Sequence, residues 1–237
     1  MALTDATREA LKGVSTATLC TALFKRSLRN QFIQGVGPVS NAGTMVGEAF
    51  TLRYIPARED LNPLSVFQDP KHPQRDAVER CPPGAVMVID SRKDPRAASA
   101  GDILATRLMV RGCAGLVTDG GFRDSPEMAE MAMPIYHARP SAPTNLTLHQ
   151  AIDIDVPIGC GDVAVFPGDV IVGDGEGVVV IPAHLADEIA NEAVEMTVFE
   201  DFVLEEVQNG RSIIGLYPPT HEQTKMDFAE WRKAKGR

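Results

Sequence analysis

Apolar and polar residues follow a helical period at both ends of this chain. Residues 4 to about 28 predict helices that break near Lys12-Gly13-Val14, and Ser15 is a suitable N-cap for the second one. Apolar residues recur at helical spacing again from Ala183 to about Val207, and a last helix is expected over Glu222 to Lys235. We expect these two C-terminal helices to pack outside the core or between subunits.

The middle of the chain carries strand signals. Residues 44–54 alternate β-forming side chains, and residues 86–89 and 114–118 are short apolar runs of the kind found in buried strands. From Pro134 onward, short strands separated by Gly, Pro and Asp predict a β-barrel or meander with tight turns. Residues 173–177 (Gly-Asp-Gly-Glu-Gly) lie between two such strands with no helix behind them, so they indicate a hairpin turn and not a dinucleotide site.

Two further helices are expected between these strands. Ser99-Ala-Gly-Asp102 opens a helix over residues 103–111, which Gly112 closes. The second helix begins with Ser125 as its cap and Pro126 at its first position. Strands and helices that alternate in this way are typical of an α/β fold.

Residues 56–75 are rich in Pro, Asp and charge, so we predict a long loop with at most a short helix. Loops of this length often carry function, which makes Asp69, His72 and Arg75 outside candidates for a site. A solvated surface excursion is the plainer interpretation.

Composition narrows the function. The 237 residues include 23 basic and 32 acidic side chains, a net charge of −9 that disfavours a nucleic-acid or membrane-surface binder. The sequence contains no apolar run of membrane-spanning length and no signal-peptide pattern, so we expect a cytoplasmic protein with small molecules or proteins as partners. The four cysteines are too scattered for a zinc site and are expected to be free thiols.

The common catalytic motifs are missing. The sequence contains no P-loop, no H-E-x-x-H, no C-x-x-C and no G-x-S-x-G, and its five histidines have no spacing that suggests a ligand set.

The expected helix start at Gly101-Asp102-Ile103-Leu104 is the first candidate site. A glycine there lets free backbone N–H groups approach a ligand, and the helix dipole favours an anion such as a carboxylate. The alternative is that Asp102 only caps the helix.

The second candidate is the pair Arg123-Asp124, just past a buried strand and two glycines. Open α/β sheets bind ligands at such strand ends. Arginine offers a planar fork to a carboxylate or keto oxygen, and aspartate offers a hard oxygen to Mg²⁺ or Mn²⁺. Neighbouring opposite charges are also common on protein surfaces, so a surface ion pair without a function is the alternative interpretation. We assume at this point that the two candidate segments come together in the fold.

Two separated runs then resemble a known family. Residues 101–124 (Gly-Asp-Ile-Leu-Ala-Thr through Gly-Gly-Phe-Arg-Asp) and residues 165–182 (Val-Phe-Pro-Gly-Asp through Val-Val-Val-Ile-Pro) resemble the RraA-like family, in this order. That family includes metal-dependent 4-hydroxy-4-methyl-2-oxoglutarate/4-carboxy-4-hydroxy-2-oxoadipate aldolases and regulators of ribonuclease activity.

The resemblance implies a compact α/β domain of the swivelling β/β/α type, with a β-barrel-like core and C-terminal helices. It would form one domain over residues 1–237, with the family-matching core at about 40–190 and a helical extension at about 183–237. The implied assembly is a homotrimer or a homohexamer.

The resemblance also implies roles for the two candidate segments. The backbone of Gly101, Asp102, Ile103 and Leu104 would hold the carboxylate of a small 2-keto acid. Arg123 would contact the keto-acid oxygens, Asp124 would anchor Mg²⁺ or Mn²⁺, and Asp102 would orient a water that shuttles a proton.

The sequence therefore predicts a divalent-metal-dependent carbon–carbon lyase, a pyruvate aldolase or 2-keto acid decarboxylase. A dehydratase or hydrolase of a 2-keto-3-deoxy or diketo sugar acid would use the same site. A non-enzymatic regulator that binds a protein is the third possibility. The acid that the aldolases take from a partner subunit has no clear match here, with Glu48, Asp69 and His72 as the candidates.

Overall fold

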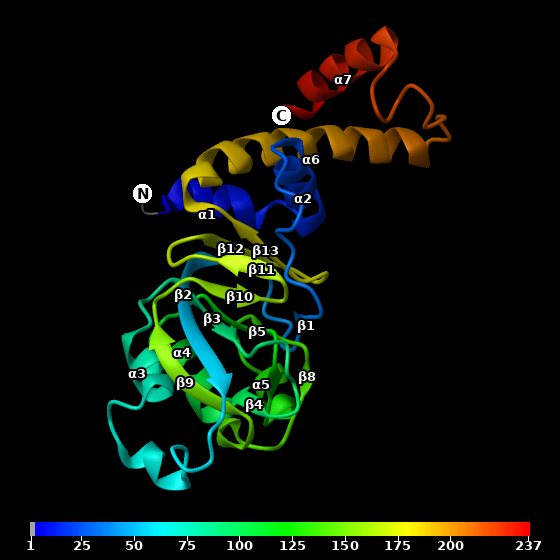
Figure 1. Ribbon diagram of the computed structural model, residues 1–237. Coiled ribbons are helices and arrows are strands. Elements are labelled where there is room, and N and C mark those ends of the chain that lie inside the picture. Colours follow the sequence, from blue (N-terminus) through cyan, green and yellow to red (C-terminus); the bar gives the residue numbers. More distant parts are fainter. Residues whose placement is uncertain (1–2) are drawn as a thin grey trace.

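Short apolar runs separated by turns form most of the strands in the computed structural model, which describes residues 3–237 (Figure 1). The strands are β1 (Gly37–Pro38), β2 (Met45–Pro56), β3 (Ala85–Asp90), β4 (Ala98–Ala100), β5 (Gly115–Thr118), β6 (Gly121–Phe122), β7 (Ile135–His137), β8 (Arg139–Pro140), β9 (His149–Ile154), β10 (Ile158–Cys160), β11 (Val163–Val165), β12 (Val170–Gly173) and β13 (Val178–Ile181).

One eight-stranded sheet is the centre of the fold. Its order is β1-β7-β5-β3-β2-β12-β13, and β9 joins the far end of β2. The 12-residue β2 runs parallel to β3 and antiparallel to both β12 and β9, with a register shift between Arg53 and Tyr54. Because one long strand changes partners along its length, the sheet curls into a nearly closed, barrel-like form. This confirms the predicted α/β fold with a barrel-like core.

The helices surround this sheet in three groups. They are α1 (Asp5–Lys12), α2 (Thr16–Lys25), α3 (Pro73–Arg80), α4 (Asp102–Val110), α5 (Ser125–Ala129), α6 (Ala186–Gln208) and α7 (Glu222–Lys235), with 3₁₀ turns η1 (Leu64–Gln68), η2 (Asn145–Thr147) and η3 (Ala183–Leu185). The group α3, α4 and α5 covers one face, where Leu108 and Met128 pack with Met87 and Leu116 of the strands. The hairpin β10-β11 covers the other face through Ile158 and Val163.

Helices α1, α2 and α6 pack over β12 and β13 at one end of the sheet (Figure 1). Ser15 caps α2, as predicted, since its side chain accepts the N–H of Thr18 at 3.1 Å. The segment at residues 173–177 is the turn of the β12-β13 hairpin, which confirms the hairpin interpretation.

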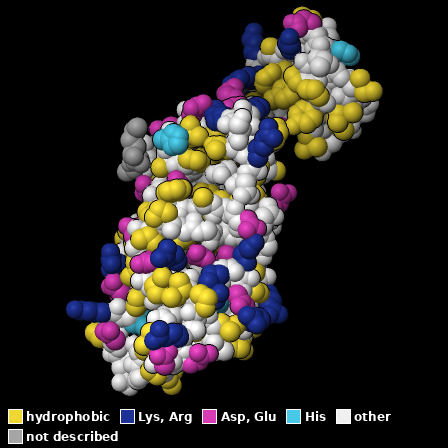
Figure 2. All heavy atoms as spheres, viewed as in Figure 1, with side chains coloured by type: hydrophobic (Ala, Val, Ile, Leu, Met, Phe, Trp, Pro, Cys, Tyr) yellow, Lys and Arg dark blue, Asp and Glu magenta, His cyan; other side chains and the backbone are white. Residues whose placement is uncertain are grey.

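The C-terminal half of α6 and all of α7 form an arm that projects from the body (Figure 1). The arm has a small apolar cluster of its own, built on Phe202, Leu216, Phe228 and Trp231. Figure 2 shows hydrophobic side chains gathered on its surface, where Ile214 is 80% exposed. We expected the last two helices outside the core or between subunits. The second half of α6 and α7 do lie outside the core, but the first half of α6 belongs to it, because Ile189 and Ala193 are fully buried against β12 and β13.

Two local predictions need correction. The N-cap of α5 is Asp124 and not Ser125, which is the first helical residue. The loop that we predicted over residues 56–75 ends earlier, because α3 begins at Pro73. Proline is tolerated in the first turn of a helix, because the backbone N–H that it lacks would make no hydrogen bond within the helix there.

Among residues 3–237, no helix combines the length and the apolarity needed to cross a membrane.

Candidate functional site

Two short parallel strands bring the sequence candidates together. β4 and β6 pair in parallel, with Ala98 opposite Gly121 and Ala100 opposite Phe122. Gly101 and Arg123 are the residues that follow these two strands, so they leave the small sheet side by side. The N–H of Arg123 donates to the carbonyl of Ala100 at 3.1 Å, which fixes this arrangement. The start of α4 and the Arg123-Asp124 pair therefore lie in one place, as we had assumed from the sequence.

Gly101 permits an unusually close approach at this point. A Cβ atom at Gly101 would lie 2.5 Å from Oδ2 of Asp124 and 2.8 Å from Nε of Arg123. Real Cβ atoms do not come this close to other heavy atoms, so any side chain at this position would push the charged pair away. The glycine thus leaves room for the two neighbouring side chains in their present positions, whereas its own backbone angles are extended and do not call for glycine.

Asp124 adopts a strained backbone that aims it at α4. Its φ of 56° and ψ of 36° place it in the left-handed region, which aspartate tolerates better than most residues. Its Oδ2 lies 3.2 Å from Nε of Arg123 and accepts the N–H of Asp102 at 3.4 Å. Strained residues of this kind are concentrated at functional sites.

The N-terminus of α4 already receives two carboxylates from the protein itself. Asp124 takes the N–H of Asp102, and Oδ1 of Asp102 takes the N–H of Ile103 at 2.7 Å. Gly101 occupies the N-cap position and Asp102 is the first helical residue. The Asp102 carboxylate contributes to capping because it accepts one of the free N–H groups at this helix end. A ligand carboxylate that bound to these N–H groups would replace at least one internal contact.

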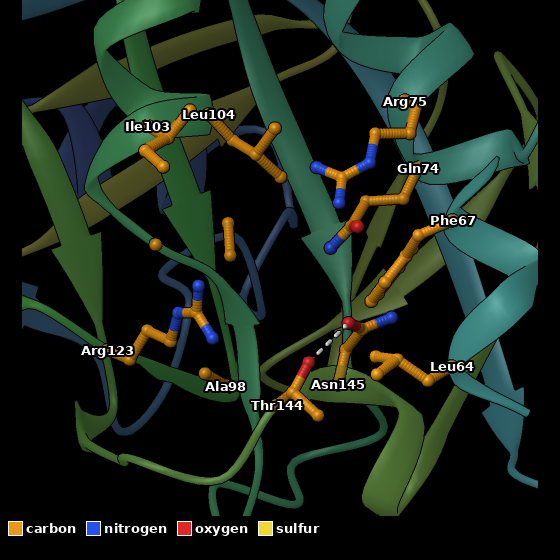
Figure 3. A pocket seen from close by; sticks show the side chains of 12 residues that line it. Leu64, Phe67, Gln74, Arg75, Ala98, Ile103, Leu104, Arg123, Thr144 and Asn145 are labelled. Atoms are coloured by element: carbon orange, nitrogen blue, oxygen red, sulfur yellow. Dashed lines mark hydrogen bonds between the residues drawn. The ribbon is translucent and has the colours of Figure 1, made fainter. Parts of the chain in front are cut away.

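A cavity of about 320 Å³ lies directly beside this cluster (Figure 3). Its lining comes from the loop before α3, from α3, β4, α4 and the segment at η2: Leu64, Phe67, Gln74, Arg75, Ala98, Ala100, Gly101, Ile103, Leu104, Arg123, Thr144 and Asn145. The volume is at the lower end of the range for small-molecule sites. Asp124 lies beyond Arg123 and lines a separate, shallower hollow.

A hydroxyl network behind the cavity holds β4 in place. The Oγ of Ser99 lies 2.5 Å from that of Ser91 and 2.9 Å from Oγ1 of Thr118. The carbonyl of Ser99 accepts hydrogen bonds from the Tyr54 hydroxyl at 2.8 Å and from Nε2 of Gln74 at 2.7 Å. Burial raises the pKa of Tyr54, so this phenol stays protonated and remains a donor.

The family profile of the RraA-like proteins, described as Aldolase/RraA, matches residues 16–180. The chain belongs to the RraA-like family. The matched range contains β4, α4, β6 and the cavity, and the resemblance noted in the sequence is thereby confirmed.

Relatives within the RraA-like family carry two kinds of name. A protein of Halalkalibacterium halodurans named "Putative 4-hydroxy-4-methyl-2-oxoglutarate aldolase" is 37% identical over 117 residues, 49% of this chain and 55% of that protein. The crystal structure of Streptomyces coelicolor RraAS2, an unusual member of the RNase ES inhibitor RraA protein family, has 28% identity and a TM-score of 0.75, covering 85% of this chain and 97% of that one. The chain spans between 29% and 55% of the length of the curated relatives that it matches first.

A further solved structure supports the fold alone. An uncharacterized protein from Pseudomonas syringae pv. tomato has a TM-score of 0.77 at 23% identity and covers 90% of this chain and 97% of that one.

The start of α4 offers few ligands to a cation. Among the described residues, no group of three or more His, Cys, Asp and Glu side chains converges as a ligand set. Asp102 and Asp124 are partly exposed carboxylates at one helix end, and Mg²⁺ is commonly held by one or two carboxylates with water in its other positions. The donor chemistry at this end of α4 therefore fits such a cation, although it does not form a closed cage.

Of the four further candidates from the sequence, Arg75, His72, Asp69 and Glu48, only Arg75 lines the cavity. The buried His72 precedes α3, where burial and the nearby Arg75 guanidinium lower its pKa. Asp69 lies in the exposed loop and accepts the N–H of Lys71 at 2.8 Å. Glu48 lies on β2, where it accepts the N–H of Leu3 at 3.2 Å, and it does not line the cavity of its own chain.

Sequence reasoning missed the polar residues Gln74, Thr144 and Asn145. Gln74 lies in α3, a helix whose start falls inside the segment that we predicted to be a proline-rich loop. Asn145 lies in a 3₁₀ turn of three residues, which is too short to give a sequence pattern. Pro73 was the one available signal, as a proline in a first helical turn.

Proposed function

We propose that this chain is a divalent-metal-dependent carbon–carbon lyase that acts on a small 2-keto acid, of the pyruvate aldolase or decarboxylase type. The observation that carries the proposal is the convergence of three residues: Gly101 and Arg123 line the cavity, and Asp124 contacts Arg123 just beside it. An anion-binding helix end, a guanidinium and a carboxylate next to each other are what cleavage beside a keto group needs.

The substrate carboxylate would bind at the N–H groups of Asp102, Ile103 and Leu104. Arg123 would donate to the keto oxygen and stabilise the negative charge that reaches it when the bond between C3 and C4 breaks. The C4 hydroxyl would lose its proton to a water oriented by Asp102, and protonation at C3 would then give pyruvate. A Mg²⁺ or Mn²⁺ ion held at Asp124 would add Lewis-acid stabilisation of the same charge.

Supporting evidence comes from relatives with an aldolase name and from the exposed apolar rim of the cavity. Leu64 and Ile103 at this rim are 73% and 72% exposed. A second copy of the chain over the rim would remove this apolar surface from water, in keeping with the expected homotrimer or homohexamer.

The direct test is pyruvate release from oxaloacetate and from 4-hydroxy-4-methyl-2-oxoglutarate, with Mg²⁺ or Mn²⁺ and with EDTA. We expect metal-dependent release that Asp124→Ala abolishes, and a loss of about 10²-fold or more in kcat for Arg123→Ala, as for the loss of an oxyanion donor. Absence of pyruvate under every metal, or near-normal turnover of Arg123→Ala, would refute the lyase.

The same groups would also serve a dehydratase or hydrolase of a 2-keto-3-deoxy or diketo sugar acid, which would be tested next. Similarity to RraAS2 favours a different second candidate, a regulator of ribonuclease activity that binds a protein. Thermal stabilisation by pyruvate or oxalate together with Mg²⁺ separates the two classes, because a pure protein-binding module gains no stability from these ligands.

A further inference from the structure

Arg75 is a cation without an anionic partner in the wall of the cavity. It is the third residue of α3, it is partly buried, and no carboxylate of the described residues lies within ion-pair distance of it. Its guanidinium instead lies over the ring of Phe67, 4.5 Å from the centroid. Stacking on an aromatic ring orients the planar guanidinium and leaves its N–H groups free for a ligand.

Arg75 and Arg123 face one another across the same space. Figure 3 shows the two guanidinium groups reaching toward the middle of the cavity, Arg75 from α3 and Arg123 from the segment after β6. Arg123 shares its charge with Asp124, whereas Arg75 has no such neighbour. Two like charges at one small cavity repel each other, and an anionic ligand group beside Arg75 would reduce this repulsion.

The lining between the two arginines matches a short carbon chain with a polar far end. Ala98, Ala100 and Leu104 supply apolar contacts in the middle. Asn145 and Thr144 add polar groups to the wall, and the Thr144 hydroxyl donates to Oδ1 of Asn145 at 3.2 Å (Figure 3).

We propose that Arg75 is the specificity residue of this cavity: it forms a second anion subsite, opposite Arg123, that binds the carboxylate at the far end of the substrate. This inference rests on the proposed function, because the first carboxylate and the keto group are assumed to bind at α4 and Arg123. It names the residue that recognises the far half of the substrate.

The test compares two ligands of equal chain length, 2-oxoglutarate and 2-oxopentanoate, which differ in the distal carboxylate. Their Kd values are measured by calorimetry with Mg²⁺ for the full chain, for Arg75→Gln and for Arg80→Gln. Arg80 lies on the same helix, is exposed and does not line the cavity, so it is a matched control for the loss of a charge.

We expect the unaltered chain to bind 2-oxoglutarate at least tenfold more tightly than 2-oxopentanoate. Arg75→Gln should weaken 2-oxoglutarate by about 10- to 100-fold, as the loss of a hydrogen bond to a charged group predicts, and should leave 2-oxopentanoate within about twofold. Arg80→Gln should change neither. In kinetics, Arg75→Gln should raise KM for 4-hydroxy-4-methyl-2-oxoglutarate and leave it unchanged for 4-hydroxy-4-methyl-2-oxopentanoate.

Equal weakening of both acids by Arg75→Gln would overturn the inference, since the residue would then serve the common part of the ligand or the fold. Equal affinity of the unaltered chain for the two acids would overturn it as well and would leave the lyase proposal intact. If the unaltered chain bound neither acid, the proposed keto-acid site itself would fail, and the distal subsite with it.

Discussion

At the scale of single residues, the site depends on one missing Cβ atom. Gly101 leaves the space that Asp124 and Arg123 fill, at distances of 2.5 and 2.8 Å from where a Cβ would stand. The backbone of Gly101 is extended, so alanine can adopt it, and the cost of a substitution falls on the neighbouring charges. Gly159 on β10 is a matched control because a Cβ there would meet nothing within 4 Å.

Gly101→Ala should therefore damage the site and spare the fold. We expect kcat/KM for pyruvate release to fall by about 10²-fold, because a shift of about 1 Å in catalytic groups has an effect of that size. Gly159→Ala should keep normal kinetics, and circular dichroism should show native secondary structure in both variants. Unchanged kinetics in Gly101→Ala would contradict the close packing described here.

His137 is a second residue with a measurable consequence. Burial lowers its pKa to about 4, its Nδ1 is buried without a partner, and its ring lies 5.9 Å from that of Phe122. In the unfolded chain the imidazole has its ordinary pKa of about 6.5, so between pH 6.5 and 4 the unfolded state binds a proton at His137 that the folded state does not bind. His137 therefore stabilises the fold less and less as the pH falls through that window.

Urea unfolding of the unaltered chain and of His137→Gln at several pH values tests this. As the pH falls from 6.5 to 4, the unaltered chain should lose unfolding free energy relative to His137→Gln, by at most about 1.4 kcal/mol per pH unit. Buried acids such as Asp119, whose pKa burial raises, act in the opposite direction but are common to both proteins. Parallel pH profiles would show that His137 is not buried in this way.

At the scale of elements, the glycine-rich turn after β12 also supports a helix. The carboxylate of Asp174 accepts the N–H of Thr16 at 2.8 Å and its hydroxyl at 2.9 Å, at the first residue of α2. It also accepts the N–H of Glu176 within the turn at 2.9 Å. The glycine-rich segment at residues 173–177 is thus a hairpin turn, and its Asp174 carboxylate connects the sheet to α2 by hydrogen bonds.

Asp174→Ala should lower the unfolding free energy by about 1–3 kcal/mol, the range for losing a helix cap and hydrogen bonds to a charged group. Glu176→Ala, at an exposed position of the same turn, should cost less than about 0.5 kcal/mol. Urea denaturation of both variants measures the difference. Equal costs would mean that the contact to α2 contributes nothing.

Element by element, the long periodic segments could be predicted from the sequence and the short ones could not. The last helix was expected over Glu222 to Lys235, which is the range of α7, because fourteen residues carry enough pattern. β4 and β6 have three and two residues, too few for any period, yet this pair brings Gly101 and Arg123 together. The site residues were therefore identified from chemistry and family resemblance, and their convergence needed the structure.

At the scale of the whole molecule, the body and the C-terminal arm have separate apolar clusters. Trp231, the single tryptophan of the chain, lies in the arm, where its Nε1 donates to Glu205 at 2.9 Å and its ring lies 5.8 Å from that of Phe202. Small clusters on projecting elements open more readily than a central core. Tryptophan fluorescence thus reports on the arm and not on the sheet.

We expect the fluorescence transition in urea to precede the loss of amide-exchange protection in β2 and β3, because the arm can open while the sheet stays folded. Phe228→Ala, which removes a ring 6.3 Å from that of Trp231, should move the fluorescence transition to lower urea and leave the exchange of β2 unchanged. Coincident transitions in both proteins would show that arm and body unfold as one unit.

The segment between β2 and α3 has a consequence for how new specificities could be made. It supplies Leu64 and Phe67 to the cavity, and it runs from the end of β2 at Pro56 to the start of α3 at Pro73, so it contains neither Gly101 nor Arg123. Exchange of residues 57–72 as one cassette would therefore keep Gly101 and Arg123, and it would change the far end of the cavity, including the Phe67 ring under Arg75. A library confined to these residues would vary the size of substrate accepted, and natural drift could do the same while the chemistry stayed constant.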